Sequence, residues 1–528
     1  MARSLVRRAP LGATLALAAL AAACARKEVP AGLGRRVADA DAVALRASAD
    51  GAWLAYLHRC QPVKDRTLPA GTGACDLSVV PAGGGEPRRI AGGVTTLPHG
   101  FGWSGSGGTL ATLSAYDHAE GRGTLVLWAG GAPRRVAEDV TFYALDRAGR
   151  TAGWVAGGRL FLGPVVAGEA RAIAGAEGVS TFELGGEGGL AALARRASRA
   201  GGDLLGVRDG ASTVIAADVR EYGFARDRAR FAFTSGATQR LALGDARDGR
   251  ASPPLGRDVS SFLFSPVGGA IAFVADAAPG RQGDLWVAAG GGAPRRLAER
   301  AGEPRWSSDG SRLAWLQQYD PRSRTGTLAV GAQGERPRAV APNVSDFDLT
   351  PDGSWVAYLA HVTAGGYSVD LAVAPARPDV RPIGADSVGA RRWVPRPPAQ
   401  VARGVFGFGF SPDGKWLLYR NACVRQGEAC DLGRVPAAGP TPGKEQERLA
   451  EGVKSFEFAP GRPERLLVSW SRKDRVALDL AIWEAGKLTS VDTYALPGSA
   501  QFVGGDPHRL AYAVVAPKRQ GVYVAEVP

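Results

Sequence analysis

The sequence has little of what metal, redox and membrane-spanning proteins need. Its 528 residues include one methionine, five cysteines and five histidines, and the histidines (58, 99, 118, 361 and 508) lack metal-ligand spacing. One stretch alone is apolar enough to interact with a bilayer, and it lies at the N-terminus. Hydrophobic residues make up 45% of the chain and charged residues 22%, which argues against a disordered or collagen-like protein. We therefore expect a globular chain without a metal or other cofactor.

Lysine is absent between Lys64 and Lys415, so the basic residues behind the formal net charge of +13 are mostly arginines. A basic balance often marks nucleic-acid binding. Here the arginines are dispersed along the chain rather than clustered. We therefore expect no nucleic-acid partner.

The N-terminal segment has the organisation of an export signal. Arg3, Arg7 and Arg8 precede an apolar run at residues 11–23, which is too short to cross a bilayer that needs about 20 residues. The run ends in Leu-Ala-Ala-Ala-Cys and resembles the signal of bacterial lipoproteins. That resemblance implies removal of residues 1–23 and lipidation of Cys24. The alternative is plain secretion, with cleavage near the alanines and a free cysteine.

The residues around Cys24 refine the expected location. Ala21 stands where lipoprotein signals prefer leucine, while Ala25 rather than aspartate follows the cysteine. In Gram-negative lipoproteins the second feature implies the outer membrane. We expect an outer-membrane lipoprotein that faces the periplasm or the cell surface, with residues 24–33 as a tether and the N-terminal lipid as its membrane contact.

One short unit recurs over residues 34–528. Its clearest copy is Phe408-Gly-Phe-Ser-Pro-Asp-Gly-Lys-Trp-Leu-Leu-Tyr419, in which Pro-Asp-Gly predicts a tight turn between two strands. Eleven copies are recognisable, with turn positions at 50, 106, 148, 187, 227, 267, 309, 352, 413, 461 and 506.

Each unit continues with two more predicted strands. The third covers residues such as 76–79 and 284–287, and the fourth follows Pro-Arg-Arg at 87–89 and 294–296. Four strands in about 40 residues, repeated many times, indicate an all-β protein with the β-propeller fold. The arginines could form an anion site, but charge on an outer strand also discourages edge-to-edge pairing, and we favour that role.

The hairpin of this unit resembles the WD40-like (PD40) repeats of the TolB-like propeller proteins of the Tol–Pal system. The resemblance covers nearly all of residues 34–528 and implies the propeller fold. TolB-like proteins also carry an N-terminal α/β domain, for which the short segment before the first unit leaves no room. The Tol–Pal role is therefore not expected. Similar repeats form the propeller of prolyl-oligopeptidase-type peptidases.

The last unit lacks a fourth strand of its own. Residues 34–38 (Gly-Arg-Arg-Val-Ala) resemble the fourth strands of other units, so we expect the first strand to complete the last unit. Eleven units exceed the four to eight blades of most propellers, and two propellers are therefore expected. A division near residue 255 would close both rings, and the Pro- and Arg-rich segment 375–403 is expected to be a linker or insertion.

The remaining four cysteines occupy equivalent places in two units. Cys60 and Cys75 follow the second strand of one unit, and Cys423 and Cys430 follow the second strand of another. The second member of each pair lies in Ala-Cys-Asp-Leu. In an oxidising compartment these pairs predict two local disulfides.

Sequence motifs for catalysis are missing. The chain has no Gly-x-Ser-x-Gly elbow and no phosphate-binding glycine loop. We therefore expect a non-catalytic cell-envelope scaffold whose propeller face binds a protein or peptide, through loops near residues 95–100 and 401–405.

Two other functions stay open at this point. One is a propeller enzyme, a hydrolase or lyase, with its site in the central channel. The other is glycan binding by exposed aromatic side chains, although a place in the core is the favoured interpretation of these residues. The candidate aromatic residues are Trp103, Trp306, Trp355 and Trp416.

Overall fold

The computed structural model describes residues 32–528 except 66, 167, 187–188, 197–201, 268, 277–281, 290–291, 333, 361–368, 378–379, 383–390, 394–396, 425–427, 441–445 and 473–475. The expected signal, Cys24 and most of the tether lie outside these residues. The regular elements of the described part are strands, which confirms the all-β class. Accordingly, this part contains no helix of the length and apolarity that a membrane span requires.

The strands of the first half of the chain run from β1 to β18. Their bounds are β1 Arg35–Ala38, β2 Ala44–Ala47, β3 Trp53–Pro62, β4 Gly73–Pro81, β5 Arg88–Thr95, β6 Phe101–Trp103, β7 Leu110–Asp117, β8 Arg122–Trp128, β9 Arg134–Leu145, β10 Thr151–Ala156, β11 Arg159–Pro164, β12 Arg171–Glu177, β13 Val179–Leu184, β14 Ala192–Arg196, β15 Gly202–Arg208, β16 Ala211–Phe224, β17 Arg230–Ser235 and β18 Arg240–Asp245.

The strands of the second half run from β19 to β42. Their bounds are β19 Ser261–Phe264, β20 Ile271–Ala275, β21 Asp284–Ala288, β22 Arg295–Ala298, β23 Gly302–Trp306, β24 Leu313–Asp320, β25 Thr325–Gly331, β26 Arg338–Leu349, β27 Trp355–Ala360, β28 Asp370–Pro375, β29 Val380–Pro382, β30 Arg391–Trp393, β31 Ala399–Ala402, β32 Gly407–Phe410, β33 Trp416–Asn421, β34 Cys430–Pro436, β35 Glu447–Val453, β36 Ser455–Ala459, β37 Arg462–Ser471, β38 Leu478–Glu484, β39 Lys487–Ala495, β40 Gln501–Phe502, β41 Arg509–Val514 and β42 Gly521–Glu526.

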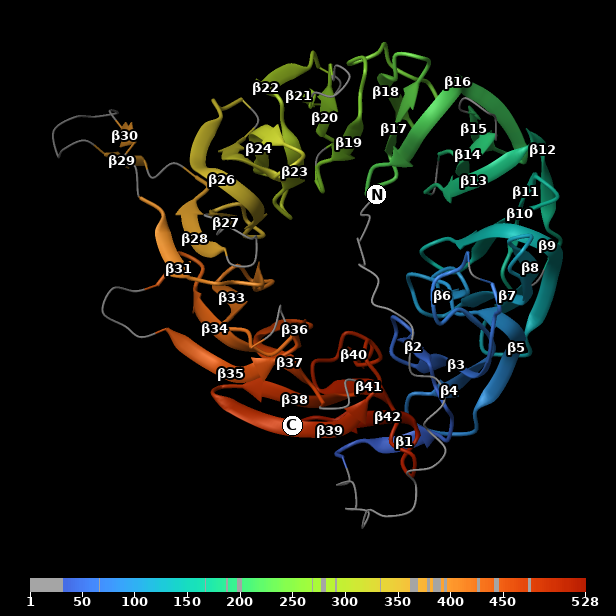
Figure 1. The fold of residues 1–528 in the computed structure, drawn as a ribbon. Helices are drawn as coiled ribbons and strands as arrows, with labels where there is room; N and C mark the ends of the chain where they lie inside the picture. Colours follow the sequence, from blue (N-terminus) through green and yellow to red (C-terminus); the bar gives the residue numbers. More distant parts are fainter. Residues whose placement is uncertain are drawn as a thin grey trace.

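Successive strands pair antiparallel in groups of four that follow one another around a ring (Figure 1). The groups β2–β5, β19–β22 and β32–β35 are separate four-stranded sheets. The long strands β9, β16 and β26 each serve two groups, because their first halves pair with the preceding strand and their second halves with the following one. In the group of β16–β18, the bridges Leu241–Gly256 and Gly244–Ala251 replace a fourth strand.

Hydrophobic clusters join each group to the next. Leu57 of β3 packs with Leu110 of β7, and Leu241 of β18 packs with Phe273 of β20. Throughout the described residues, a cluster of this kind lies at every junction between successive groups. The core is therefore a chain of sheet-to-sheet interfaces, with small residues such as Ala55 and Ala272, both 0% exposed, letting neighbouring sheets approach.

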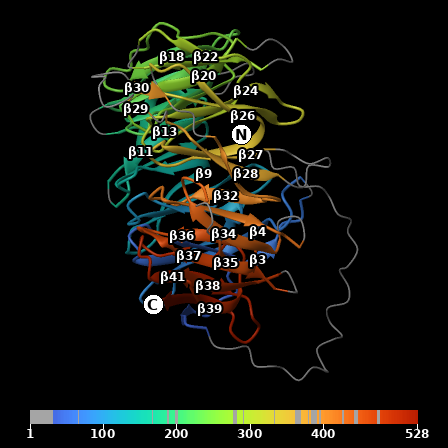
Figure 2. The same ribbon diagram turned by 90° about the vertical axis from the view of Figure 1, so that its left-hand side faces the viewer.

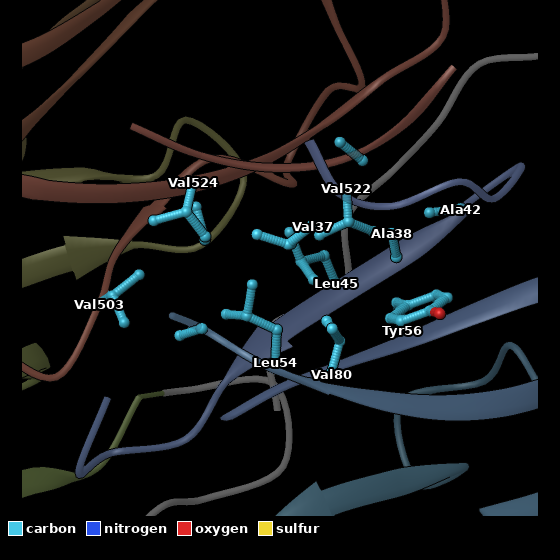
Figure 3. Close-up of a cluster of buried hydrophobic side chains, with 13 residues drawn as sticks. Val37, Ala38, Ala42, Leu45, Leu54, Tyr56, Val80, Val503, Val522 and Val524 are labelled. Carbon is cyan, nitrogen blue, oxygen red and sulfur yellow. The ribbon is translucent and has the colours of Figure 1, made fainter. Parts of the chain in front are cut away.

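The two ends of the chain close the ring. β1 pairs antiparallel with β42, with Arg35 opposite Val524, so the first strand completes the last group as the sequence predicts. Side chains of β1, β3 and the last strands converge there, including Val37, Leu54 and Val503 (Figure 3). The blue N-terminal and red C-terminal strands lie together in both ribbon views (Figures 1 and 2).

This closure differs from the two propellers that the number of units predicts. A division near residue 255 would leave the sheets on its two sides unpacked, yet a buried cluster joins Leu241 and Leu243 to Ile271 and Phe273. A second cluster joins the last strands to β3. The described strands therefore form one ring (Figure 1). Within residues 375–403, the hairpin β29–β30 projects outside it, while β31 returns to pair with β28.

The repeated turn reverses the chain and also forms hydrogen bonds to the neighbouring turn. The Ser411 hydroxyl donates to Asp413 Oδ1 at 2.6 Å and accepts the Trp416 N–H at 3.0 Å, and Ser48 and Ser307 repeat the arrangement. The turns also touch their neighbours: Asp309 N–H donates to the Pro351 carbonyl of the next turn at 2.9 Å. The turns therefore stabilise the ring as well as each hairpin.

The two neighbouring arginines on a fourth strand contact different groups. The first arginine of the pair reaches the following group: Arg88 donates to Gly130 O at 3.1 Å, and Arg134 donates to Pro164 O and Val165 O at 2.8 Å each. The second pairs within its own group, as Arg89 does with Asp76 at 2.7 Å. Many of the basic residues are thus engaged in holding the ring together.

Candidate functional site

Antiparallel alternation places two kinds of connection on one face of the ring. The links between second and third strands share that face with the links between a fourth strand and the next first strand. The predicted loop at residues 95–100 and the disulfide loop after β3 both belong to it. Thr96 N–H donates to Gly73 O at 3.0 Å, and Gly73 N–H donates to Thr96 Oγ1 at 3.0 Å, so the two loops are hydrogen-bonded to each other.

Both predicted disulfides are present, and both lie in links of this kind. Cys60 bonds Cys75, and Cys423 bonds Cys430, across 15 and 7 residues of sequence. Cys75 and Cys430 are buried at 1% and 0% exposure. Each disulfide therefore ties a face loop to the core.

Loop 95–100 is held by side chains from the two groups that follow it. The His118 Nε2 atom lies 3.0 Å from Thr95 Oγ1, and the Tyr143 hydroxyl donates to the His99 carbonyl at 3.0 Å. Burial raises the pKa of the Tyr143 hydroxyl well above its ordinary value, so it stays a donor. The loop is fixed, while Pro98 and His99 remain exposed at its tip.

A cluster of rings surrounds the tip. The His99 Nε2 atom lies 3.0 Å from the Tyr116 hydroxyl, and the Tyr116 ring lies edge-on to His118 with centroids 5.0 Å apart. Partial desolvation and the neighbouring His118 lower the pKa of the His99 imidazole, so it is mainly neutral at pH 7. We name His99, Tyr116 and His118 the tip cluster. It offers aromatic surface with hydrogen-bonding edges, the combination typical of protein interfaces.

The second predicted loop, at 401–405, is less prominent. Val401 and Val405 are buried at 3% and 2% exposure, and Val405 N–H donates to Val369 O at 3.0 Å. Arg403, between them, is exposed. The structure thus places both predicted loops on the same face, and the 95–100 loop carries the exposed rings.

The four tryptophans considered for glycan binding pack against the sheet-to-sheet clusters. Each is half-buried at a junction between groups. The Arg434 guanidinium covers the Trp416 ring, 4.0 Å from its centroid. Their contacts favour the core role over an exposed sugar platform. The four residues are Trp103, Trp306, Trp355 and Trp416.

Three carboxylates on the inner strands were not predictable from the sequence. Partial desolvation by the surrounding strands raises the pKa values of Glu221 on β16, Asp348 on β26 and Glu457 on β36. By contrast, Glu183 on β13 is paired with Arg228 at 2.9 Å. In the sequence these acids look like ordinary strand residues, because only the ring places them on innermost strands (Figure 1).

The three carboxylates with raised pKa values lie apart and do not form a catalytic pair. Glu221, Asp348 and Glu457 belong to three different strand groups. Among the residues that the structure describes, no three His, Cys, Asp or Glu side chains gather as a metal site would need. The tip cluster is therefore the stronger candidate for a functional surface.

Comparisons with known proteins assign no family to the chain. No protein-family profile and no curated protein matches the sequence. Among solved structures, a eukaryotic initiation factor aligns with a TM-score of 0.41 and 12% identity, over 70% of this chain and 94% of that one. The tricorn protease aligns with a TM-score of 0.32 and 12% identity, over 85% of this chain and 58% of its own.

Proposed function

We propose that the chain is a non-catalytic lipoprotein scaffold of the Gram-negative cell envelope, and that its loop face binds a protein or peptide. Each four-strand group is one WD40-like (PD40) repeat of the TolB-like kind, and the ring contains eleven of them. The observation that carries the binding role is the fixed loop 95–100, which presents the exposed His99 beside a disulfide-tied loop. Preorganised loops bind with less loss of conformational entropy than mobile ones.

The binding role is tested by affinity capture from envelope extracts with the full-length chain. The variant His99→Ala/Tyr116→Ala removes the ring contacts of the tip cluster, and Arg226→Ala, an exposed change in the β16–β17 turn on the opposite face, is the matched control. We expect a reproducible partner to be retained by the wild type and the control and lost by the double variant. The same proteins recovered with all three chains would contradict the proposal.

The lipid anchor is tested separately. Replacing Cys24→Ser should move the protein from the membrane fraction to the soluble fraction after export, because a lipid chain supplies most of the membrane affinity. Fractionation of cells that produce either chain measures this directly. An unchanged membrane fraction would instead favour attachment through a partner.

A further inference from the structure

The repeats share an ion pair between their third and fourth strands. In three groups, an aspartate in the first half of the third strand meets an arginine on the fourth. The pairs are Asp76–Arg89 at 2.7 Å, Asp284–Arg296 at 3.1 Å and Asp431–Arg448 at 3.3 Å. The register is the same each time, because the arginine lies opposite the residue two positions after the aspartate.

The group of β6–β9 has the arginine of this ion pair but lacks the aspartate. Arg135 lies opposite Val126, so the aspartate position is Thr124. In the group of β23–β26 the aspartate is also replaced, by Thr327, but there the arginine is replaced as well, by Ala339. Arg135 therefore occupies the arginine position of a group that lacks the partner aspartate.

Arg135 is also free of other partners. Its side chain is exposed and forms no ion pair or hydrogen bond within the described part of the chain, whereas the side chain of its neighbour Arg134 is bonded to two carbonyls. The other arginine nearby, Arg89, is neutralised by Asp76. The uncompensated positive charge at this place is thus that of Arg135.

Arg135 lines a groove between the first two groups on the outer side of the ring. The groove measures about 550 Å³. One wall is Ile90 and Ala91 of β5, and the other is Val126 of β8 with Pro133. Ile90, Ala91 and Val126 are buried, so the exposed apolar part of the groove is Ala115 and Pro133. Arg89 and Ser114 also line it. The groove is therefore a mixed polar and apolar surface beside one unpaired guanidinium.

We propose that this groove binds an acidic protein segment, with one Asp or Glu carboxylate on Arg135 and a neighbouring apolar side chain against the exposed Ala115 and Pro133. Guanidinium and carboxylate match in a forked, charge-assisted geometry. One unpaired cation suits one carboxylate of a peptide, whereas a lipid surface is attracted by several cations together. The groove is a different surface from loop 95–100, so binding at the groove is tested independently of the proposed function.

The test is an array of short peptides in which each member with one Glu next to Leu or Val is printed beside its Gln counterpart. The full-length protein is applied as wild type, as Arg135→Ala and as Thr124→Asp. The last variant keeps Arg135 but supplies the internal acid that other repeats have. We expect the wild type to prefer the Glu members by about three- to tenfold and both variants to lose that preference.

Three results would overturn the proposal. One is a wild type that binds Glu and Gln members equally. Another is a preference that survives Thr124→Asp, because the charge of Arg135 would then not be its source. The third is binding to anionic phosphatidylglycerol vesicles that depends on Arg135 while the array shows no preference for acid, which would assign the groove to lipid. Arg226→Ala, in the distant β16–β17 turn, should behave as the wild type. The test variants change the exposed Arg135 and the half-buried Thr124, and both should keep the wild-type melting temperature.

Discussion

Glycine at the repeated turns meets two separate demands. Gly107 and Gly461 both have positive φ angles, +87° and +65°, which cost other residues about 1–2 kcal/mol. Gly107 also lies against the neighbouring turn, where a Cβ atom would come 2.5 Å from the Asp50 backbone nitrogen. At Gly461 the same atom would meet nothing within 4 Å. The first glycine is thus required by its neighbour as well as by its own backbone.

The two demands can be separated by one substitution at each place. Gly461→Ala should cost about 1 kcal/mol, from backbone strain alone. Gly107→Ala should cost at least about 2 kcal/mol more, since backbone atoms must shift to admit the methyl group. Melting temperatures of the two variants measure the difference. Equal losses would show that the turns do not depend on their mutual contact.

The turn aspartates link stability to pH. Burial would raise the pKa of the Asp413 carboxyl, but hydrogen bonds from the Ser411 hydroxyl and the Lys415 backbone outweigh it and hold the pKa below its ordinary value of 3.8. A lowered folded-state pKa contributes stability above the unfolded value, and that contribution is lost as pH falls through the folded value. Asp309 and Asp352 shift in the same direction.

Removal of one hydroxyl should reveal this coupling. Ser411→Ala deletes the bond to Asp413 and the bond from Trp416 N–H, and should cost about 1–2 kcal/mol at pH 7. The difference from the wild type should shrink as pH falls below 3.8 and through the lowered folded-state pKa of Asp413, where the carboxyl becomes protonated in both chains. Unfolding followed at several pH values provides the measurement. In the Asp413→Asn background the remaining effect of Ser411→Ala should be independent of pH, and a pH dependence there would point to another group.

At the scale of the strand, neighbouring arginines have different tasks. Arg134 donates to two carbonyls of the following group, and Arg135 faces the outer groove. Arg134→Ala should therefore lower the melting temperature by a few degrees, through the loss of about 1–2 kcal/mol of charge-assisted bonds. Arg135→Ala is the adjacent control and should leave stability within about 0.5 kcal/mol of the wild type. Thermal denaturation of both variants compares them, and equal losses would argue against the contact between groups.

The closing strand offers a second test at this scale. β1 pairs with β42 through backbone hydrogen bonds. Its Val37, 7% exposed, packs in the cluster with Leu54 and Val503. Deleting residues 34–38 should lower the melting temperature markedly, because an edge and a hydrophobic face both become exposed. Arg36→Ala, an exposed change on the same strand, should have little effect. A deletion with an unchanged melting temperature would mean that the pairing does not hold the ring closed.

The strand pattern was predictable from sequence wherever the signal was local. Turns such as Pro412-Asp413-Gly414, the closure by Arg35–Ala38 and the pairing of Cys60 with Cys75 all follow from short motifs and their spacing. The tip cluster was not predictable, because it brings His99 of one loop to Tyr116 of β7. The exception at Arg135 emerged only once strand register had aligned it with Thr124.

For the whole molecule, the number of rings depends on the angle between neighbouring sheets, which no motif encodes. That angle is set by how side chains interdigitate at each junction, and small residues such as Ala55, Ala232 and Ala272 govern the approach. The number of units therefore suggested two rings, whereas the packing on both sides of residue 255 is continuous. Because every junction depends on its two neighbours, stability should be shared around the ring, as in other repeat proteins.

A cut at residue 255 distinguishes one ring from two. Residues 32–255 alone would expose the Leu241–Leu243 side of one junction and the Leu54–Val80 side of the closing cluster, and residues 256–528 would expose the complementary surfaces. We expect each half to aggregate or remain poorly folded when produced alone, because each leaves two large apolar faces in water. Co-production should yield a one-to-one complex, measured by size-exclusion chromatography with circular dichroism. Two halves that are each monomeric and cooperatively folded would instead show that each part closes by itself, and would contradict the single ring.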